Sequence, residues 1–175
     1  MVEFSVAEKR SALAGMAVID LCVRAYFRER IIQELLDADL TVHVFGADWE
    51  RMPCKKPWNL IANGGQVDSA ACVQAVREAR LSLNVMPWFK DGAHDRVFTA
   101  MLQGTAALTD DSRYLREEFT DGKELVFYAL SSVAPLPGLV YDLLRDEERL
   151  ERIAMEGYRA AGKRHTWGER ARMLF

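Results

Sequence analysis

The sequence predicts an α/β protein: a Rossmann-like three-layer αβα lobe, in which helices cover both faces of a parallel sheet of about five strands. Short apolar segments alternate with helical segments between residues 40 and 128. Polar loops containing glycine follow several of these apolar segments, and a helical tail completes the chain. Strands that alternate with helices require crossover connections, and crossover connections make the neighbouring strands parallel.

The composition fits one ordinary domain or one large lobe, because the chain has 175 residues and half of them are hydrophobic. The formal net charge of -3 gives no electrostatic reason to expect binding to nucleic acid or to an anionic membrane. No stretch approaches the roughly 20 apolar residues that a membrane span needs. Charged residues interrupt the first ten positions, so we expect no signal peptide.

The three cysteines, Cys22, Cys54 and Cys72, are an odd number without short spacing. This pattern suggests neither a disulfide framework nor a zinc site, and it favours reduced thiols in the cytoplasm. The histidines at positions 43, 94 and 165 are far apart and show no metal-ligand spacing. We therefore expect no bound metal.

Residues 5–38 are predicted to be helical, with a break near Gly15. Phe27, Ile31 and Leu35 recur every four residues and form an apolar stripe. We interpret residues 1–38 as a helical segment that packs on an α/β domain spanning 39–175. The arginines of this helix form either a solvated face or a docking surface for another domain.

The strand of residues 40–45 is apolar and rich in β-branched side chains, which predicts a buried parallel strand. Two prolines make residues 50–58 unsuited to regular structure, and residues 60–62 form a short strand. Asp68 is a favourable N-cap for a helix that ends near residue 80. The remaining predicted elements are strands at 81–85, 105–109 and 124–128, and helices at 95–103, 114–118, 136–144, 146–161 and 166–174.

Ligands of open α/β sheets bind beyond the carboxyl ends of the strands. The loops expected to matter are therefore 46–51, 63–68, 87–95 and 109–114. No P-loop, dinucleotide-binding or serine-hydrolase motif is present in them. Asp110 and Asp111 follow a strand, as metal-binding acidic pairs do, although Asp111 or Ser112 can equally cap the next helix.

Loop 87–95 predicts an anion site, because glycine lets the backbone approach a ligand and a helix start offers free N–H groups. Gly92 lies in this loop, and His94 and Asp95 stand where the helix begins. Arg96 can bind phosphate or carboxylate with two hydrogen bonds. The alternative is a capped helix whose arginine pairs with a neighbouring acid. Trp88 and Phe89 either pack or offer a stacking surface.

Five sequence words occur in a fixed order: GADW, NGGQVDSA, LSLNVMPWFKDGAHDRVFTAMLQGTAALTD, FTDGKELVFY and IAMEGYRAAGKRHTWGERA. In this order they resemble the carboxyl-terminal half of GT-B glycosyltransferases, from about residue 18 to the end. The closest group is the spore-maturation CgeB-like glycosyltransferases, with their "glycosyl transferases group 1" domain.

The resemblance implies that residues 39–175 are a Rossmann-like lobe that binds a nucleoside-diphosphate sugar, which is a substrate and not a cofactor. An amino-terminal lobe would supply most acceptor contacts, and the terminal HTW helix would pack back toward it. By motif position, loop 46–51 borders the diphosphate, the segment from Gly65 lies near the nucleobase, and residues 91–96 receive the phosphates and the sugar. The implied substrate-binding residues are Gly46, Trp49, Arg51, Gly65, Asp91, Gly92, Ala93, His94, Asp95, Arg96 and Thr99.

Many retaining members carry two glutamates, seven residues apart, around this loop. The corresponding positions here are Asp91 and Thr99, a shorter acid and a neutral hydroxyl. The second glutamate usually holds the ribose hydroxyls, and Thr99 offers at most one weaker contact. A complete GT-B enzyme needs about two lobes, roughly 350 residues. The isolated chain is therefore expected to bind its donor weakly and not to catalyse transfer.

Two other functions compete with sugar transfer from a nucleoside-diphosphate sugar. A non-catalytic interaction module would use the lobe for docking on a spore surface or on cell-envelope machinery. A flavodoxin-like or receiver-like domain is the third interpretation, although Asp110 and Asp111 alone make a thin acidic pocket. The expected partners are the nucleotide-sugar donor, an amino-terminal GT-B lobe, and a second copy of the chain through exposed apolar helices.

Overall fold

The computed structural model describes residues 4–88 and 91–173, so the predicted loop residues Phe89 and Lys90 lie outside it. The first helix, α1 (Val6–Asp37), is continuous. Ser5 caps it, since its Oγ accepts from the Glu8 N–H while a Glu8 carboxylate oxygen accepts from the Ser5 N–H. The predicted break near Gly15 is wrong, because one glycine costs a helix only about 1 kcal/mol and helix-forming residues surround it.

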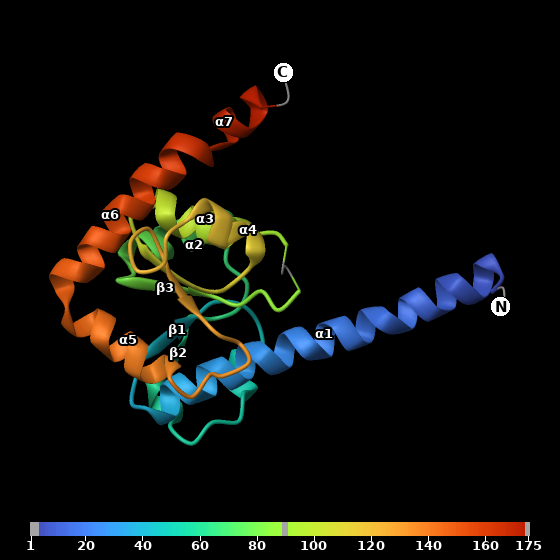
Figure 1. Cartoon of the computed structure of the whole chain (residues 1–175). Helices are drawn as coiled ribbons and strands as arrows, with labels where there is room; N and C mark the ends of the chain where they lie inside the picture. Colours follow the sequence, from blue (N-terminus) through green and yellow to red (C-terminus); the bar gives the residue numbers. More distant parts are fainter. Residues whose placement is uncertain (1–3, 89–90, 174–175) are drawn as a thin grey trace.

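The two halves of α1 have different surroundings (Figure 1). The second half packs on the body of the protein and buries Ile31, Ile32, Leu35 and Leu36. The first half projects into solvent and leaves apolar side chains exposed, among them Val6, Leu13, Met16, Val18, Ile19 and Leu21. Within the described residues, no helix combines the length and the apolar character needed to span a bilayer.

Within the described ranges, all strands pair in parallel, as predicted, but they form two sheets. One sheet contains β1 (Val42–Val44) and β2 (Leu60–Ala62), and the other has the order β3 (Leu81–Asn84), β4 (Ala106–Asp110), β5 (Val126–Tyr128). The predicted single sheet of about five strands is therefore wrong. The strand of residues 40–45 is also less buried than expected, since only the last residue of β1 is buried. Side chains of β1 and β3 nevertheless share one hydrophobic cluster.

Further helices follow α1 and surround the strands (Figure 1): α2 (Ser69–Glu78), α3 (Asp95–Leu102), α4 (Arg113–Glu118), α5 (Leu136–Arg145), α6 (Glu147–Arg164) and α7 (Trp167–Arg172). The caps expected from the sequence are present, because Asp68 caps α2 and Thr166 caps α7. Residues 50–58, predicted to lack regular structure, overlap two short 3-10 turns, at Trp49–Arg51 and Pro57–Asn59.

Alternating side chains of β4 define the two faces of the larger sheet. Ala106 and Leu108 belong to a cluster that includes buried residues of α1, α5 and α6. Ala107 points to the opposite side, into a cluster with residues of α3 and α4. Successive side chains of a strand point to opposite faces, so helices cover both sides of this sheet. The predicted three-layer αβα architecture is confirmed.

Helix α6 approaches the entry to β5 through Gly157. A Cβ atom at this position would lie 2.4 Å from the backbone oxygen of Glu124 and 3.5 Å from the Cε of Met101. Gly162, five residues further along the same helix, has open space around it. Gly157 therefore permits a close contact between a helix and a backbone turn, and Gly162 does not serve this purpose.

The junction between α6 and α7 is built on His165, whose side chain is 2% exposed. Its ring stacks on Phe98 of α3, with the ring centroids 4.8 Å apart. Arg170 donates to Nδ1 over 2.7 Å, and Nε2 lies 3.3 Å from a carboxylate oxygen of Glu118. Burial, followed by the positive charge of Arg170, lowers the pKa of His165, while Glu118 acts in the opposite direction. The neutral imidazole therefore stabilises this junction.

We expect the folded protein to lose stability as the pH falls from neutrality through the ordinary histidine pKa and then through the lowered pKa of folded His165. In this window the unfolded chain binds more protons, so acidification favours unfolding. Urea unfolding at pH 7, 6 and 5 would measure the loss. His165→Gln should show a weaker pH dependence than the native chain, and an unchanged slope would contradict the assignment.

Candidate functional site

Four buried polar side chains lie at the carboxyl edge of the three-stranded sheet: Asn84, Thr109, Asp110 and Tyr128. The Asn84 amide donates to the Thr109 hydroxyl over 3.0 Å. The Tyr128 hydroxyl donates to the backbone oxygen of Asn84 over 2.7 Å. Sequence reasoning missed Asn84, Thr109 and Tyr128 as site residues. The signal was available, because each one is a polar residue at or near the end of an apolar strand.

The chain that leaves β3 is fixed to this edge. The backbone N–H of Met86 donates to Oδ1 of Asp110 over 2.6 Å. Further along, the guanidinium of Arg24 lies over the ring of Trp88, 5.5 Å from its centroid. Helix α1 thus lies against the loop that the sequence singled out, and Trp88 contributes a cation–π contact from a half-exposed position.

His94, Asp95 and Arg96 form the start of α3, and His94 is its N-cap. Nδ1 of His94 pairs with a carboxylate oxygen of Asp95, and Nε2 lies 3.0 Å from the Arg96 guanidinium. A neutral ring with its proton on Nδ1 donates to Asp95 and accepts from the Arg96 guanidinium at Nε2. This tautomer gives up the longer capping contact, in which the Arg96 backbone N–H lies 3.3 Å from Nδ1. Burial and the charge of Arg96 lower the pKa of His94, which favours this neutral form.

A second arginine, Arg28 of α1, influences the electrostatics of His94 and Arg96. Partial desolvation and then the positive charge of Arg28 lower the pKa of Arg96, and Arg28 also lowers the pKa of His94. Among the residues that the structure describes, neither Arg28 nor Arg96 forms an ion pair with a carboxylate. The alternative in which Arg96 pairs with a neighbouring acid is therefore not what the structure shows.

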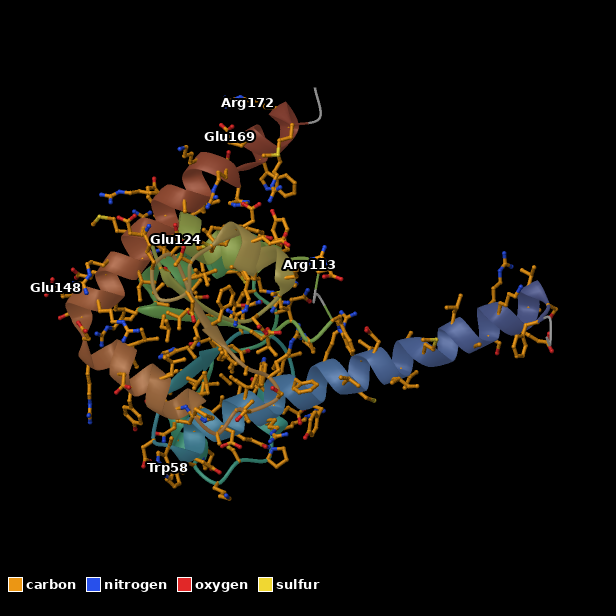
Figure 2. The ribbon with its side chains drawn as sticks, in the orientation of Figure 1. Trp58, Arg113, Glu124, Glu148, Glu169 and Arg172 are labelled. Atoms are coloured by element: carbon orange, nitrogen blue, oxygen red, sulfur yellow. The ribbon has the colours of Figure 1, made fainter. Side chains whose placement is uncertain are left out.

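The other predicted residues of this loop have different surroundings. Ala93 packs against the hydrophobic cluster beside α3, and Gly92 lies in the turn that precedes it. Asp91 is exposed and lies 3.6 Å from the side chain of Arg113, which Figure 2 labels at the surface near α4. The Thr99 hydroxyl donates to the backbone oxygen of Asp95 over 3.0 Å. The hydroxyl proton of Thr99 is therefore used in a hydrogen bond within its own helix.

Gly46, Trp49, Arg51 and Gly65 form a second group beyond β1 and β2. The N–H of Gly46 donates to the oxygen of Gly65 over 3.0 Å, and both glycines have a positive φ, of 121° and 69°. The Trp49 ring covers Gly46, and exposed Arg51 pairs with Asp48 at 3.3 Å. These contacts link residues within the second group and do not join it to α3.

The acidic residues at the end of β4 and directly after it contact protein groups. Asp110 accepts from Met86, Asp111 pairs with Arg116 over 2.9 Å, and Ser112 is the N-cap of α4. Across the described parts of the chain, no three His, Cys, Asp or Glu side chains are grouped so that they could hold a metal ion. Of the two interpretations of this segment, capping by Ser112 is the one observed.

The arrangement can bind an anion. Three features converge at the carboxyl edge of a parallel sheet: the N-terminus of α3, the guanidinium of Arg96, and the positive charge of Arg28. Two cations that are held near each other repel, and a bound anion would relieve that repulsion. A phosphate group offers the charge and the acceptor oxygens that such a place requires.

Comparison with known proteins gives a family and a fold. Residues 24–175 match the model of the family described as "Glycosyl transferase-like". No curated protein sequence matches the chain at a significant level. Among solved structures, HepE from Anabaena is similar in complexes with UDP-glucose (TM-score 0.62, 14% identity) and with UDP (0.59, 16%); each alignment covers 81% of this chain and 44% of HepE.

TarM is also similar, with a TM-score of 0.59 and 13% identity over 89% of this chain and 31% of TarM. The chain thus spans less than half the length of these proteins. At these identities the likeness establishes the fold, and together with the family match it confirms the predicted resemblance to GT-B glycosyltransferases. The chain belongs to the glycosyl transferase-like family.

Proposed function

We propose that this chain is the donor-binding lobe of a glycosyltransferase that moves a sugar from a nucleoside-diphosphate sugar to an acceptor. The observation that carries the proposal is a pair of arginines, Arg28 of α1 and Arg96 of α3, that have no carboxylate partner among the described residues. HepE, which shares the fold, was solved with UDP and with UDP-glucose, and this supports a uridine diphosphate as the first ligand to test.

The proposed chemistry assigns electrostatic roles to the chain. Negative charge builds on the diphosphate as the bond to the sugar breaks, and fixed donors stabilise that charge most where water is excluded. Arg96 and the N–H groups of α3 would bind the phosphates nearest the sugar, and Arg28 would add charge from α1. Arg51 would act from the second loop after exchanging Asp48 for phosphate. A second lobe would provide the acceptor site and complete the cleft.

Titration with UDP, UDP-glucose, GDP and ADP tests this proposal. We expect one of these ligands to saturate at millimolar concentration and to shift backbone NMR signals of residues 91–99 and 46–51. Binding this weak follows from the loss of the ribose contact, since Thr99 bonds to its own helix. The absence of saturation by all four ligands, or shifts confined to other surfaces, would contradict donor binding.

A non-catalytic docking module is the second candidate, and the exposed apolar half of α1 favours it. Such a surface would suit an amino-terminal lobe or a second copy of the chain. Sedimentation at increasing concentration separates these two, because only self-association depends on the concentration of this chain alone. We also retain, as proposals, membership of the bacterial CgeB-like group and a cytoplasmic location, in keeping with the three free cysteines.

A further inference from the structure

Asp110 occupies an unusual position for a carboxylate. Asp110 is the last residue of β4, and it is 0% exposed. Carboxylates are rarely buried without partners, because removing a charge from water is costly. Asp110 receives a short hydrogen bond of 2.6 Å from the N–H of Met86, which lies two residues beyond β3. The carboxylate of Asp110 thus serves as an acceptor for the backbone of the loop that leaves β3.

Two further hydrogen bonds hold the same segment. The Asn84 side chain donates to Thr109, and the Tyr128 hydroxyl donates to the backbone oxygen of Asn84. Residues 84 and 86 are therefore bonded to β4, and residue 84 also to β5, at the point where the loop leaves the sheet. Burial, and next the negative charge of Asp110, raise the pKa of Tyr128, so its hydroxyl remains a donor.

The tied segment leads directly to the anion site. From Met86 the chain passes Trp88, turns at residues 91 and 92, and enters α3 at His94. The Met86 side chain is 2% exposed and packs in the same cluster as Val97 and Met101 of α3. A shift at Met86 would therefore move both the loop and the helix that presents Arg96. Misplacement of a binding group by about 1 Å can cost about 100-fold in function.

We propose that Asp110 is a positioning residue for donor binding: its carboxylate fixes the Met86 backbone and so sets where the first turn of α3 meets the diphosphate. The proposal rests on the proposed function for its ligand, and it assigns Asp110 no contact with that ligand. Its action is independent of which base or sugar the donor carries.

The test compares three variants of the full chain. Asp110→Ala removes the acceptor, whereas Asp110→Asn keeps an oxygen acceptor and removes the charge. Asp121→Ala is the matched control, because Oδ1 of Asp121 likewise accepts from a backbone N–H of this sheet, that of Phe127 in β5, over 2.9 Å, and Asp121 lies in the turn before β5. The readouts are the Kd for UDP, the NMR shift and hydrogen exchange of the Met86 amide, and exchange at residues 91–96.

We expect Asp110→Ala to raise the Kd for UDP about ten-fold or more, the size of a lost hydrogen bond to a charged group. The Met86 amide should move upfield, and exchange at 91–96 should quicken. Asp110→Asn should recover most of the affinity, and Asp121→Ala should lose stability but keep the native Kd. Equal Kd values for Asp110→Ala and Asp121→Ala, or no recovery in Asp110→Asn, would overturn the proposal.

The experiment remains decisive if the native chain does not bind UDP or if Asp110→Ala does not fold. If the native chain does not bind UDP, the donor-binding function fails, while exchange at Met86 and at 91–96 still decides whether Asp110 holds the loop. If Asp110→Ala does not fold, Asp110→Asn carries the comparison. A neutral acceptor should leave the Met86 amide bonded but weaker, and an unchanged Met86 signal would then count against the proposal.

Discussion

Arg96→Ala is expected to weaken UDP binding by about ten- to a hundred-fold, which corresponds to about 1.5–3 kcal/mol for hydrogen bonds to a charged group. The guanidinium is the proposed phosphate ligand at the start of α3, and its present partner is the ring of His94. The free energy of unfolding should change little, because Arg96 is an exposed residue without a carboxylate partner among the described residues. Isothermal titration and urea unfolding measure the two effects separately.

Matched variants identify the source of the loss. Arg28→Ala should weaken binding less than Arg96→Ala, and added salt should reduce its effect, since Arg28 acts through its field. Arg152→Ala removes an exposed arginine of α6 that pairs with Glu148, labelled in Figure 2 on the outer side of that helix. This control should leave the Kd unchanged. If unfolding is the main effect of Arg96→Ala, then Arg96 has a structural role and the binding assignment fails.

Gly157→Ala is expected to destabilise the fold by about 1–3 kcal/mol, the usual cost of overpacking. The added methyl group would meet the Glu124 backbone oxygen at 2.4 Å, and Figure 2 shows Glu124 beside α6. That oxygen cannot retreat cheaply, because the turn before β5 is held by hydrogen bonds of Thr120 and Gly122. The better helix propensity of alanine offsets about 1 kcal/mol of the strain and does not remove it.

Gly162→Ala on the same helix provides the control. A methyl group there would meet nothing within 4 Å, so the substitution should stabilise α6 by up to about 1 kcal/mol. Urea unfolding of both variants, compared with the native chain, gives the two differences. Opposite signs support the close approach at Gly157, and equal effects would show that α6 can shift away from the turn.

Local signals account for what the sequence predicted well. Asp68, Ser112 and Thr166 cap helices because their side chains bond to N–H groups three residues away, a distance fixed by local geometry. The alternation of short strands and helices fixed the parallel arrangement. By contrast, the division into two sheets depends on whether β1 and β3 approach closely enough to bond, which no local pattern encodes.

The features that sequence reasoning missed are long-range. Tyr128 reaches the backbone of Asn84 across 44 positions, and Arg28 influences Arg96 from a separate helix. The motif predicted Arg96 and His94, but it did not show that α1 brings a second cation to them. Gly157 looked like any helical glycine, because its role depends on the backbone of Glu124 and not on its own neighbours.

The contact between His94 and Arg96 has a consequence for how readily the site accepts a ligand. Where a carboxylate holds a guanidinium, an incoming anion binds only after that ion pair is broken, and the cost of breaking it lowers the affinity for the anion. Here the imidazole gives Arg96 an orientation while occupying it only with a neutral acceptor. Exchange for a phosphate oxygen is therefore a step from a weaker bond to a stronger one. His94 thus orients the Arg96 guanidinium without an ionic bond that an incoming phosphate would have to break.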